Sequence, residues 1–525
     1  MPFKKPSEVK ATSNKPHLIV EAGPGTGKTT TMIAGLHMMQ GKEPEWFNQA
    51  TDEQIAIWES MYGSYRSIAF QAFNKSIATE IQKLVPKRVK ASTFHSFGYS
   101  VLRDSGLKVK TSQINDQILV KNQMGYEKND RMDKKDYEKC MKVCKFISLL
   151  KNNLLQSSKS NILNVANHNG IGVDDDVDEI EELASYAMVT IRNEAETGSI
   201  KWISFDDMLW LPIMLGMDFG SSKVDLLICD ESQDLNAVQH EMVIQSASRL
   251  ICVGDPRQAI YGFRGADAKS IDTIEKKLAA TERGVQRLPL LTSFRLPISG
   301  VENVSSFAPG LRARNGAPKG KIINYNMSDL EVDSGDLVVS RINANIFSLA
   351  FRLLKMRTPV RIEGRDFGKQ LINILKNNSS GESISEVANG IQMFDVKERV
   401  RLEKKQFSEK LIDAHDEKMS CLYSLMDGCE SLNQMISTIE DLFDNDIPRE
   451  EVVLLSTIHR AKGLEADRVL FLEPGLVPHP MAKLEHERTQ EYNLKFVAET
   501  RHKETLVYVH EDSNEDDRDD LMGID

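Results

Sequence analysis

A glycine-rich loop near the start of the chain constrains the fold more than any other feature. The apolar run HLIV at residues 17–20 is followed by EAGPGTGKTTTMIAGLHMM, which predicts a strand, a loop and a helix in that order. Glycines let the loop turn its backbone N–H groups inward, and the helix N-terminus adds a positive end. This arrangement is typical of a phosphate site in an α/β fold. The alternative, a chance glycine turn, leaves the flanking strand and helix unexplained.

The same loop predicts ATP and Mg²⁺ as ligands. Lys28 is expected to reach the β- and γ-phosphates, and the Thr29 hydroxyl to ligate Mg²⁺. Alanine stands at position 22, where the strict pattern has glycine. The predicted nucleotide-binding residues of the loop are Ala22, Gly23, Pro24, Gly25, Thr26, Gly27, Lys28, Thr29 and Thr30.

Two later apolar runs end in polar residues that suit the same site. VDLLICDESQD predicts a buried parallel strand, with Asp230 and Glu231 at its carboxyl end. There, Asp230 is expected to hold Mg²⁺ and Glu231 to orient the attacking water. The alternative is a solvated acidic loop. RLICV at 249–253 predicts a third strand, after which Gln258 lies close enough to sense a γ-phosphate.

The segment GDPRQAIYGFRGAD, residues 254–267, joins this polar chemistry to groups that stack on bases. Tyr261, Phe263 and Arg264 follow Gln258 within six residues. Aromatic stacking on single-stranded bases contributes about 1–3 kcal/mol per base and tolerates any sequence. The alternative for Tyr261 and Phe263 is ordinary core packing.

Length, composition and charge bound the remaining possibilities. A chain of 525 residues is expected to form two to four domains. It has no apolar run of bilayer length and no signal-peptide core, so we expect no membrane segment and a cytoplasmic protein, or a nuclear one in a eukaryote. None of the six cysteines has CxxC spacing, which favours reduced structural thiols.

The net charge of −11 argues weakly against nucleic acid when it is taken alone. The charge is uneven, however: lysine is frequent between 108 and 151, and the tail from Glu511 is strongly acidic. A local basic groove is compatible with an acidic total. We expect the tail to be disordered and solubilising, with binding of a protein partner as the alternative.

The ordered motifs resemble the UvrD/Rep-like branch of the superfamily 1 helicases. The matching blocks follow the family's order: EAGPGTGKTT, AFQAFNKSIATEI (69–81), STFHSFG (92–98), FDDML (205–209) with ICDESQD, the segment 254–267, LTSFRLP (291–297), LSTIHRAKGLEADRVLFL (455–472) and FVAETRHKETLVYV (496–509). The pairing of FNKSIA with TFHS, together with TSFR, is most similar to the F-box DNA helicase branch. No F-box precedes these motifs, so we expect a motor-only relative.

The resemblance implies roles for residues outside the glycine loop. In this family the segment containing Gln258 and Tyr261 couples the nucleotide to DNA, and Arg295 and Arg501 supply positive charge at the γ-phosphate. Glu465 is implied to contact the ribose. The implied DNA-binding residues are Phe73, Asn74, Lys75, Thr93, Phe94, His95, Tyr261, Phe263, Arg264, Thr457 and His459.

The resemblance also implies an α/β fold of two RecA-like motor domains with parallel sheets, each carrying a mostly helical insertion, and ATP bound between the two. The expected divisions are 1–105 with 196–290 (motor domain 1A), 106–195 (insertion 1B), 291–375 with 447–510 (motor domain 2A), 376–446 (a short insertion 2B) and the tail 511–525.

The function implied is that of an ATP-dependent DNA helicase, and we expect it to act as a monomer. It would move 3′→5′ on single-stranded DNA, act at single-strand/duplex junctions, and serve replication, recombination or repair. Because the second insertion is short, a translocase that displaces proteins without much unwinding is the alternative. A non-motor binding protein is a third possibility, which the intact Lys28, Asp230 and Glu231 disfavour. Members of this family usually have a glutamine before the glycine loop that recognises adenine. Here no glutamine precedes the loop, and the similar segment TDEQIAIW (51–58) follows it. Specificity for adenine therefore stays open.

Overall fold

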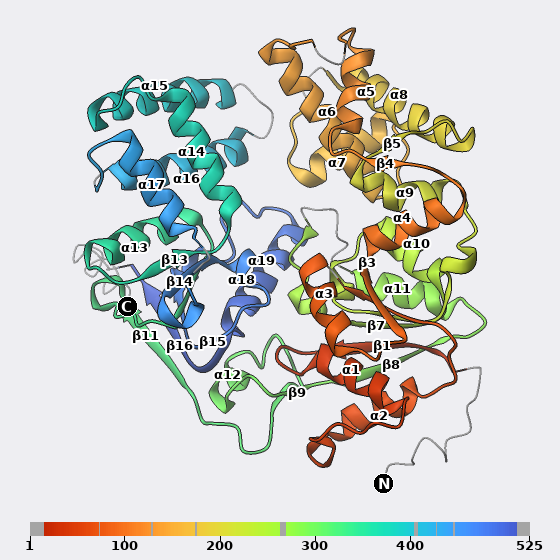
Figure 1. The fold of residues 1–525 in the computed structure, drawn as a ribbon. Coiled ribbons are helices and arrows are strands. Elements are labelled where there is room, and N and C mark those ends of the chain that lie inside the picture. Colours follow the sequence, from red (N-terminus) through yellow and green to blue (C-terminus); the bar gives the residue numbers. More distant parts are fainter. Residues whose placement is uncertain are drawn as a thin grey trace, which may run out of the picture. The chain divides into compact units, whose positions relative to one another are not determined.

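The computed structural model describes residues 15–72, 74–127, 130–173, 176–262, 269–403, 408–426, 428–444 and 447–511. The chain divides into two compact units, Met1–Thr292 and Ser293–Asp525 (Figure 1). Among the described residues, no helix has both the length and the apolar character needed to cross a bilayer.

The first unit is built on a six-stranded parallel sheet with the order β3-β2-β6-β7-β1-β8. Its strands are β1 (His17–Ala22), β2 (Ile68–Ala72), β3 (Val89–Thr93), β6 (Val224–Cys229), β7 (Ala247–Gly254) and β8 (Val285–Leu290). Successive residues of β1 enter opposite cores: Leu18 and Val20 lie in one apolar cluster, and Ile19 lies in another. Both faces of the sheet are therefore covered, which explains why the strands read as continuous apolar runs.

Helices pack on both faces of this sheet. One cluster takes side chains from α1 (Lys28–Met38), α2 (Asp52–Met61) and α3 (Lys75–Leu84). The other takes them from α4 (Phe94–Asp104), α9 (Phe205–Met214), α10 (Ala237–Ser246) and α11 (Ser270–Ala279).

A helical segment with a core of its own lies between α4 and α9. It comprises β4 (Lys110–Thr111), α5 (Asn115–Gln123), α6 (Lys134–Asn152), α7 (Lys159–Asn169), α8 (Val177–Glu196) and β5 (Trp202–Ile203). Figure 1 draws these helices in orange to yellow. Their apolar cluster also includes Trp210 and Leu211 of α9, so the segment is packed onto the helix that leads to β6.

The second unit also has a six-stranded parallel sheet, with the order β11-β16-β15-β12-β14-β13. Its strands are β11 (Lys321–Asn326), β12 (Leu337–Ser340), β13 (Val360–Ile362), β14 (Val453–Thr457), β15 (Ala466–Leu472) and β16 (His502–His510). Its helices are α12 (Ile298–Asn303), α13 (Asn343–Lys355), α14 (Arg365–Asn378), α15 (Ile384–Glu403), α16 (Ser408–Met426), α17 (Leu432–Leu442), α18 (Ile458–Ala461) and α19 (Glu485–Glu499).

The helices α15 to α17 share one apolar cluster with the sheet of the second unit. Val387 of α15, Leu422 of α16 and Ile439 of α17 belong to the same cluster as Val338 of β12 and Val453 of β14. The prediction of an α/β fold with two parallel sheets and helical parts is confirmed. The expected domain divisions remain a prediction.

Candidate functional site

The glycine loop begins where β1 ends and closes on the first turn of α1. Gly25 and Gly27 have φ values of 68° and 73°, in the left-handed region that glycine enters without strain. The buried Thr26 hydroxyl donates to the Gly23 carbonyl at 2.9 Å, which fixes the turn from within. Lys28 is the first residue of α1, so the loop N–H groups, the helix N-terminus and a lysine gather at one place.

Asp230 follows β6 and meets the start of α1. The Thr29 hydroxyl donates to Asp230 Oδ2 at 2.6 Å. Burial raises the pKa of Asp230 to about 6; Glu231 adds to this rise, whereas the Thr29 hydroxyl and Lys28 oppose it. A hydroxyl and a carboxylate oxygen are the hard ligands that Mg²⁺ prefers, so Thr29 and Asp230 fit the predicted metal.

Glu231 sits in a conformation that L-residues rarely adopt, with φ at 52°. Its backbone N–H donates to Asp230 Oδ1 at 3.0 Å. Its side chain accepts a hydrogen bond of 2.5 Å from Gln233 Nε2. Strained residues that surrounding bonds hold in place cluster at functional sites. Here the strained residue, Glu231, directly follows Asp230 at the end of the central strand β6.

The segment after β7 brings Gln258 to the same end of the sheet. Asp255 accepts from Arg257 Nε at 2.8 Å and from Gln258 Nε2 at 2.8 Å. These bonds tie the short helix Pro256–Gln258 to the residue that caps it. Gln258 is buried and Tyr261 is half-buried. Phe263 and Arg264 lie outside the described residues.

The residues predicted to bind DNA in the first unit begin α3 and α4. Asn74 accepts from the Ile77 N–H at 2.9 Å and caps α3, and the exposed Lys75 is the first residue of that helix. Thr93 caps α4. Phe73 lies outside the described residues.

Two aromatic rings near the start of α4 differ in their surroundings. The structure does not place the Phe94 ring on the surface, because it is 4% exposed within the core. His95 packs edge-on against Phe205, with ring centroids 5.8 Å apart. Phe205, which was not predicted, is the first residue of α9 and is 46% exposed. The sequence signal that could have found Phe205 is an aromatic residue at the predicted start of a helix, in the block FDDML (205–209).

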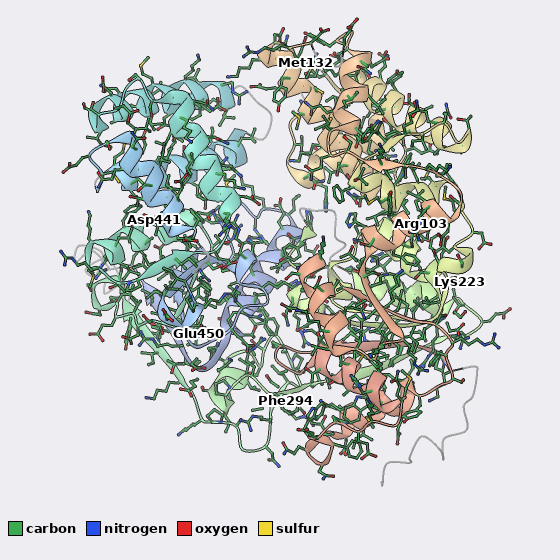
Figure 2. All side chains as sticks on the ribbon, in the orientation of Figure 1. Arg103, Met132, Lys223, Phe294, Asp441 and Glu450 are labelled. Atoms are coloured by element: carbon green, nitrogen blue, oxygen red, sulfur yellow. The ribbon has the colours of Figure 1, made fainter. Side chains whose placement is uncertain are left out.

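In the second unit, Arg295 and Arg501 come together around Thr500. Arg295 Nε lies 2.7 Å from Glu465 Oε2, and its Nη1 donates to the Thr500 carbonyl at 3.3 Å. Arg501 is 2% exposed and donates from Nη2 to Thr500 Oγ1 at 3.0 Å. Phe294, labelled in Figure 2, is 42% exposed next to Arg295.

Two titratable groups adjoin these arginines. Burial alone would raise the pKa of Glu465, but Arg295 and Lys503 outweigh it and hold that pKa below its usual range. His502 is fully buried; burial lowers its pKa to about 4, and both arginines add to the effect, so it is neutral at pH 7.

Thr457 and His459 lie at another point of the second unit. Thr457 is the last residue of β14 and is buried, whereas His459 lies in the short helix α18 and is half-buried.

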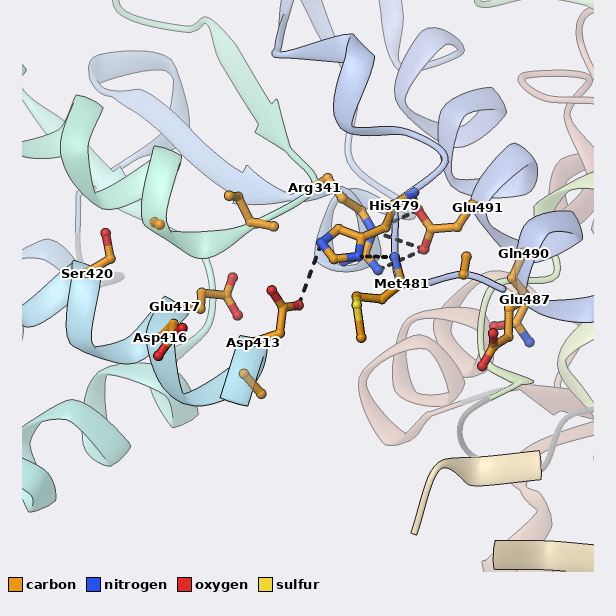
Figure 3. A pocket seen from close by; sticks show the side chains of 14 residues that line it. Arg341, Asp413, Asp416, Glu417, Ser420, His479, Met481, Glu487, Gln490 and Glu491 are labelled. Carbon is orange, nitrogen blue, oxygen red and sulfur yellow. Dashed lines mark hydrogen bonds and ion pairs between the residues drawn. The ribbon is translucent and has the colours of Figure 1, made fainter. Parts of the chain in front are cut away.

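A cavity of about 490 Å³ in the second unit contains none of the predicted site residues (Figure 3). Arg341 binds Glu491 through both carboxylate oxygens, with a shortest distance of 2.7 Å. His479 lies 3.7 Å from Asp413. With Asp416, Glu417 and Glu487 also in its lining, the cavity is too acidic to suit a phosphate.

Comparison with known families agrees with the geometry of the first unit. Residues 4–279 match the UvrD/REP helicase N-terminal domain, and residues 339–512 match the UvrD-like helicase C-terminal domain. The chain belongs to the UvrD/Rep helicase family. The resemblance predicted from the motifs is thereby confirmed.

Curated relatives are similar to this chain over different shares of their own length. F-box DNA helicase protein 1 of Schizosaccharomyces pombe is 26% identical over 310 residues, 54% of this chain and 34% of that protein. ATP-dependent DNA helicase PcrA of Leuconostoc citreum is 26% identical over 364 residues, 64% of this chain and 44% of that protein. PcrA of Staphylococcus aureus is 23% identical over 642 residues, 96% of this chain and 82% of that protein. The chain thus spans less than half of the first two relatives.

Proposed function

We propose that this chain is an ATP-dependent DNA helicase that moves along single-stranded DNA and separates duplex DNA. One observation carries the proposal: the Thr29 hydroxyl and the Asp230 carboxylate, 2.6 Å apart, lie beside Glu231 at the end of β6. The first two groups would hold Mg²⁺, which neutralises phosphate charge when it is bound, and the third would orient water. The printed names of the relatives, ATP-dependent DNA helicase, support the same activity.

Each protein group then has a distinct task in hydrolysis. The loop N–H groups and Lys28 bind the β- and γ-phosphates of ATP, and Glu231 orients the attacking water. Gln258 contacts the γ-phosphate. Arg295 and Arg501 supply positive charge as the phosphoryl group is transferred, because that charge spreads over three equatorial oxygens.

The proposed DNA interface combines helix starts with aromatic side chains. Tyr261, His95 and the exposed ring of Phe205 offer stacking surfaces, each worth about 1–3 kcal/mol per base. Helix N-termini at Asn74 and Thr93 suit backbone phosphates. The full proposed set is Phe73, Asn74, Lys75, Thr93, Phe94, His95, Phe205, Tyr261, Phe263, Arg264, Thr457 and His459; because its ring is buried, Phe94 would contribute only through its backbone.

The test is ATP hydrolysis with and without a single-stranded oligonucleotide. We expect wild-type turnover to rise at least tenfold with DNA, and Lys28→Ala to lose at least 100-fold of that turnover. Lys42→Ala, an exposed lysine four residues beyond α1, is the matched control and should behave as wild type. A wild-type rate that does not respond to DNA would contradict the proposal.

Polarity and pathway are further parts of the proposal. From the family resemblance we propose 3′→5′ movement, in replication, recombination or repair; unwinding that requires a 5′ overhang would refute that direction.

The helices α15–α17, which share the core of their unit, favour a second candidate function: a translocase that displaces proteins with little unwinding. Removal of streptavidin from biotinylated DNA, measured beside duplex unwinding, distinguishes the two.

A further inference from the structure

Gln233 forms a bridge that neither the glycine loop nor the predicted site residues include. Its Nε2 donates to Glu231 Oε2 at 2.5 Å, and its Oε1 accepts from the Asp255 backbone N–H at 3.1 Å. The side chain is 1% exposed. A single buried amide therefore joins the acidic end of β6 to the segment that follows β7.

The chemistry of the two partners suits a primary amide at this position. An ionised carboxylate only accepts hydrogen bonds and a backbone N–H only donates, so the bridging group must donate at one end and accept at the other. Leucine offers neither function, and an ionised glutamate offers only acceptors. The orientation of the Gln233 amide follows from its two partners.

The neighbouring backbone is shaped to admit this amide. A Cβ atom added to Gly254 would lie 2.3 Å from Gln233 Oε1 and 2.9 Å from Ile271 Cδ1. Real Cβ atoms do not approach so closely, so a glycine allows Gln233 to reach the Asp255 N–H.

Beyond Asp255, the bridge continues into a rigid turn. Asp255 accepts from Gln258 Nε2 at 2.8 Å and from the Arg257 backbone N–H at 3.2 Å, so residues 255–258 are tied together as one unit. Tyr261 lies three residues further on. A displacement of this turn would move the Asp255 N–H, and with it the amide that holds Glu231.

We propose that Gln233 is a positioning residue that relays the binding of single-stranded DNA at the 255–261 segment to the orientation of the Glu231 carboxylate. The inference rests on the proposed function, because it needs DNA-stimulated hydrolysis. It adds the group through which that stimulation passes. Because Gln233 is 1% exposed and both functions of its amide are bonded within the protein, it would act through Glu231 and not through a ligand contact of its own.

The first experiment compares Gln233→Leu with Gln239→Leu. Gln239 is also an internally bonded glutamine, but it caps α10, accepting from the Asn236 N–H at 3.0 Å, and bridges no motifs. We expect the ratio of DNA-stimulated to unstimulated turnover to fall at least fivefold in Gln233→Leu, with KM for ATP and the oligonucleotide Kd within about threefold of wild type. Gln239→Leu should keep the wild-type ratio.

The second experiment measures the DNA-stimulated turnover of Gln233→Glu as a function of pH. It also tests the relay if Gln233→Leu folds poorly. Two facing carboxylates share a proton as pH falls, and the shared proton restores one donor between positions 231 and 233. We expect the stimulated turnover of Gln233→Glu to recover at least threefold, relative to wild type, between pH 8 and pH 6. A residue that merely fills the core would give parallel pH profiles.

The outcomes separate the two proposals. A wild-type enzyme without DNA stimulation refutes the proposed function. A stimulated wild type whose ratio is unchanged in Gln233→Leu refutes the relay alone. Proportional loss of stimulated and unstimulated turnover, with a pH profile of Gln233→Glu parallel to wild type, also overturns the relay and leaves the helicase proposal standing.

Discussion

A buried lysine anchors the helical segment of the first unit, and its replacement gives a large predicted effect. Lys151 of α6 is fully buried, with Nζ 2.7 Å from Asp116 Oδ1 of α5 and 2.7 Å from Asp207 Oδ1 of α9. The ammonium also lies 5.6 Å from the centre of the Trp210 ring. These contacts connect three helices. Lys151→Met retains most of the volume and removes only the charge.

The size of the loss follows from what remains after the substitution. Removing one partner of a buried ion pair leaves an uncompensated charge, which costs about 3–5 kcal/mol. Here two buried carboxylates lose their common cation, so we expect the upper part of that range. For a unit of this size, the melting temperature should fall by roughly 10 °C. Lys159→Met is the matched control, since Lys159 makes an equally short 2.7 Å pair with Asp178 at the surface.

The assay is thermal and urea denaturation of wild type and both variants at pH 7. The exposed pair of Lys159 should contribute less than about 1 kcal/mol, so its variant should melt close to wild type. If Lys151→Met were as stable as Lys159→Met, the two carboxylates would have to be solvated or protonated without cost. That result would refute a large energetic cost for burying these carboxylates without Lys151.

Three further predictions concern Asp230, Gly254 and Gln71. Burial raises the pKa of Asp230 from 3.8 to about 6, so ionisation of this carboxyl lowers the stability of the protein as pH rises through that range. Asp230→Asn should therefore stabilise the protein by about 3 kcal/mol at pH 7 but not below pH 4, measured by denaturation. The same variant should abolish ATP turnover. Gly254→Ala should destabilise by about 1–3 kcal/mol and lower DNA stimulation by displacing Gln233, whereas Gly475→Ala, whose Cβ would meet nothing within 4 Å, should do neither in the same melting and ATPase assays. Gln71 is 1% exposed and neither polar side-chain atom has a partner among the described residues, so Gln71→Met should stabilise by about 1 kcal/mol in urea; a loss of stability would show that the amide is bonded.

The elements that the sequence predicted are those whose signals are local. The glycine loop, the apolar run before Asp230 and the run before Gly254 each carry their strand or turn within about ten residues. A buried parallel strand needs apolar side chains on both faces, so continuous runs predicted β1, β6 and β7. The carboxyl ends of such strands share one edge, which is why Thr29 and Asp230 could be expected to meet.

The features that escaped prediction depend on partners distant in sequence. Lys151 lies in a lysine-rich stretch in which every lysine resembles a solvated one, and only the fold reveals the two carboxylates beside it. Gln233 sits inside a recognised motif, yet its bond to Asp255 spans 22 residues and requires the absence of a Cβ at position 254. Local patterns carry propensity and periodicity but not the register that creates such contacts.

Glu465 shows how a contact between distant residues can alter a prediction drawn from local sequence. The resemblance implied a contact with the ribose, whereas in the structure this carboxylate binds Arg295 at 2.7 Å and Lys503 at 3.1 Å. The two roles are compatible, because the Glu465 side chain is 39% exposed and its two carboxylate oxygens have different partners. A nucleotide phosphate that attracts Arg295 would leave Glu465 Oε1 paired with Lys503 and would release Glu465 Oε2 to accept from a ribose hydroxyl. We infer that the ion pair with Glu465 holds Arg295 before a nucleotide binds, and the ribose contact of Glu465 stays a prediction.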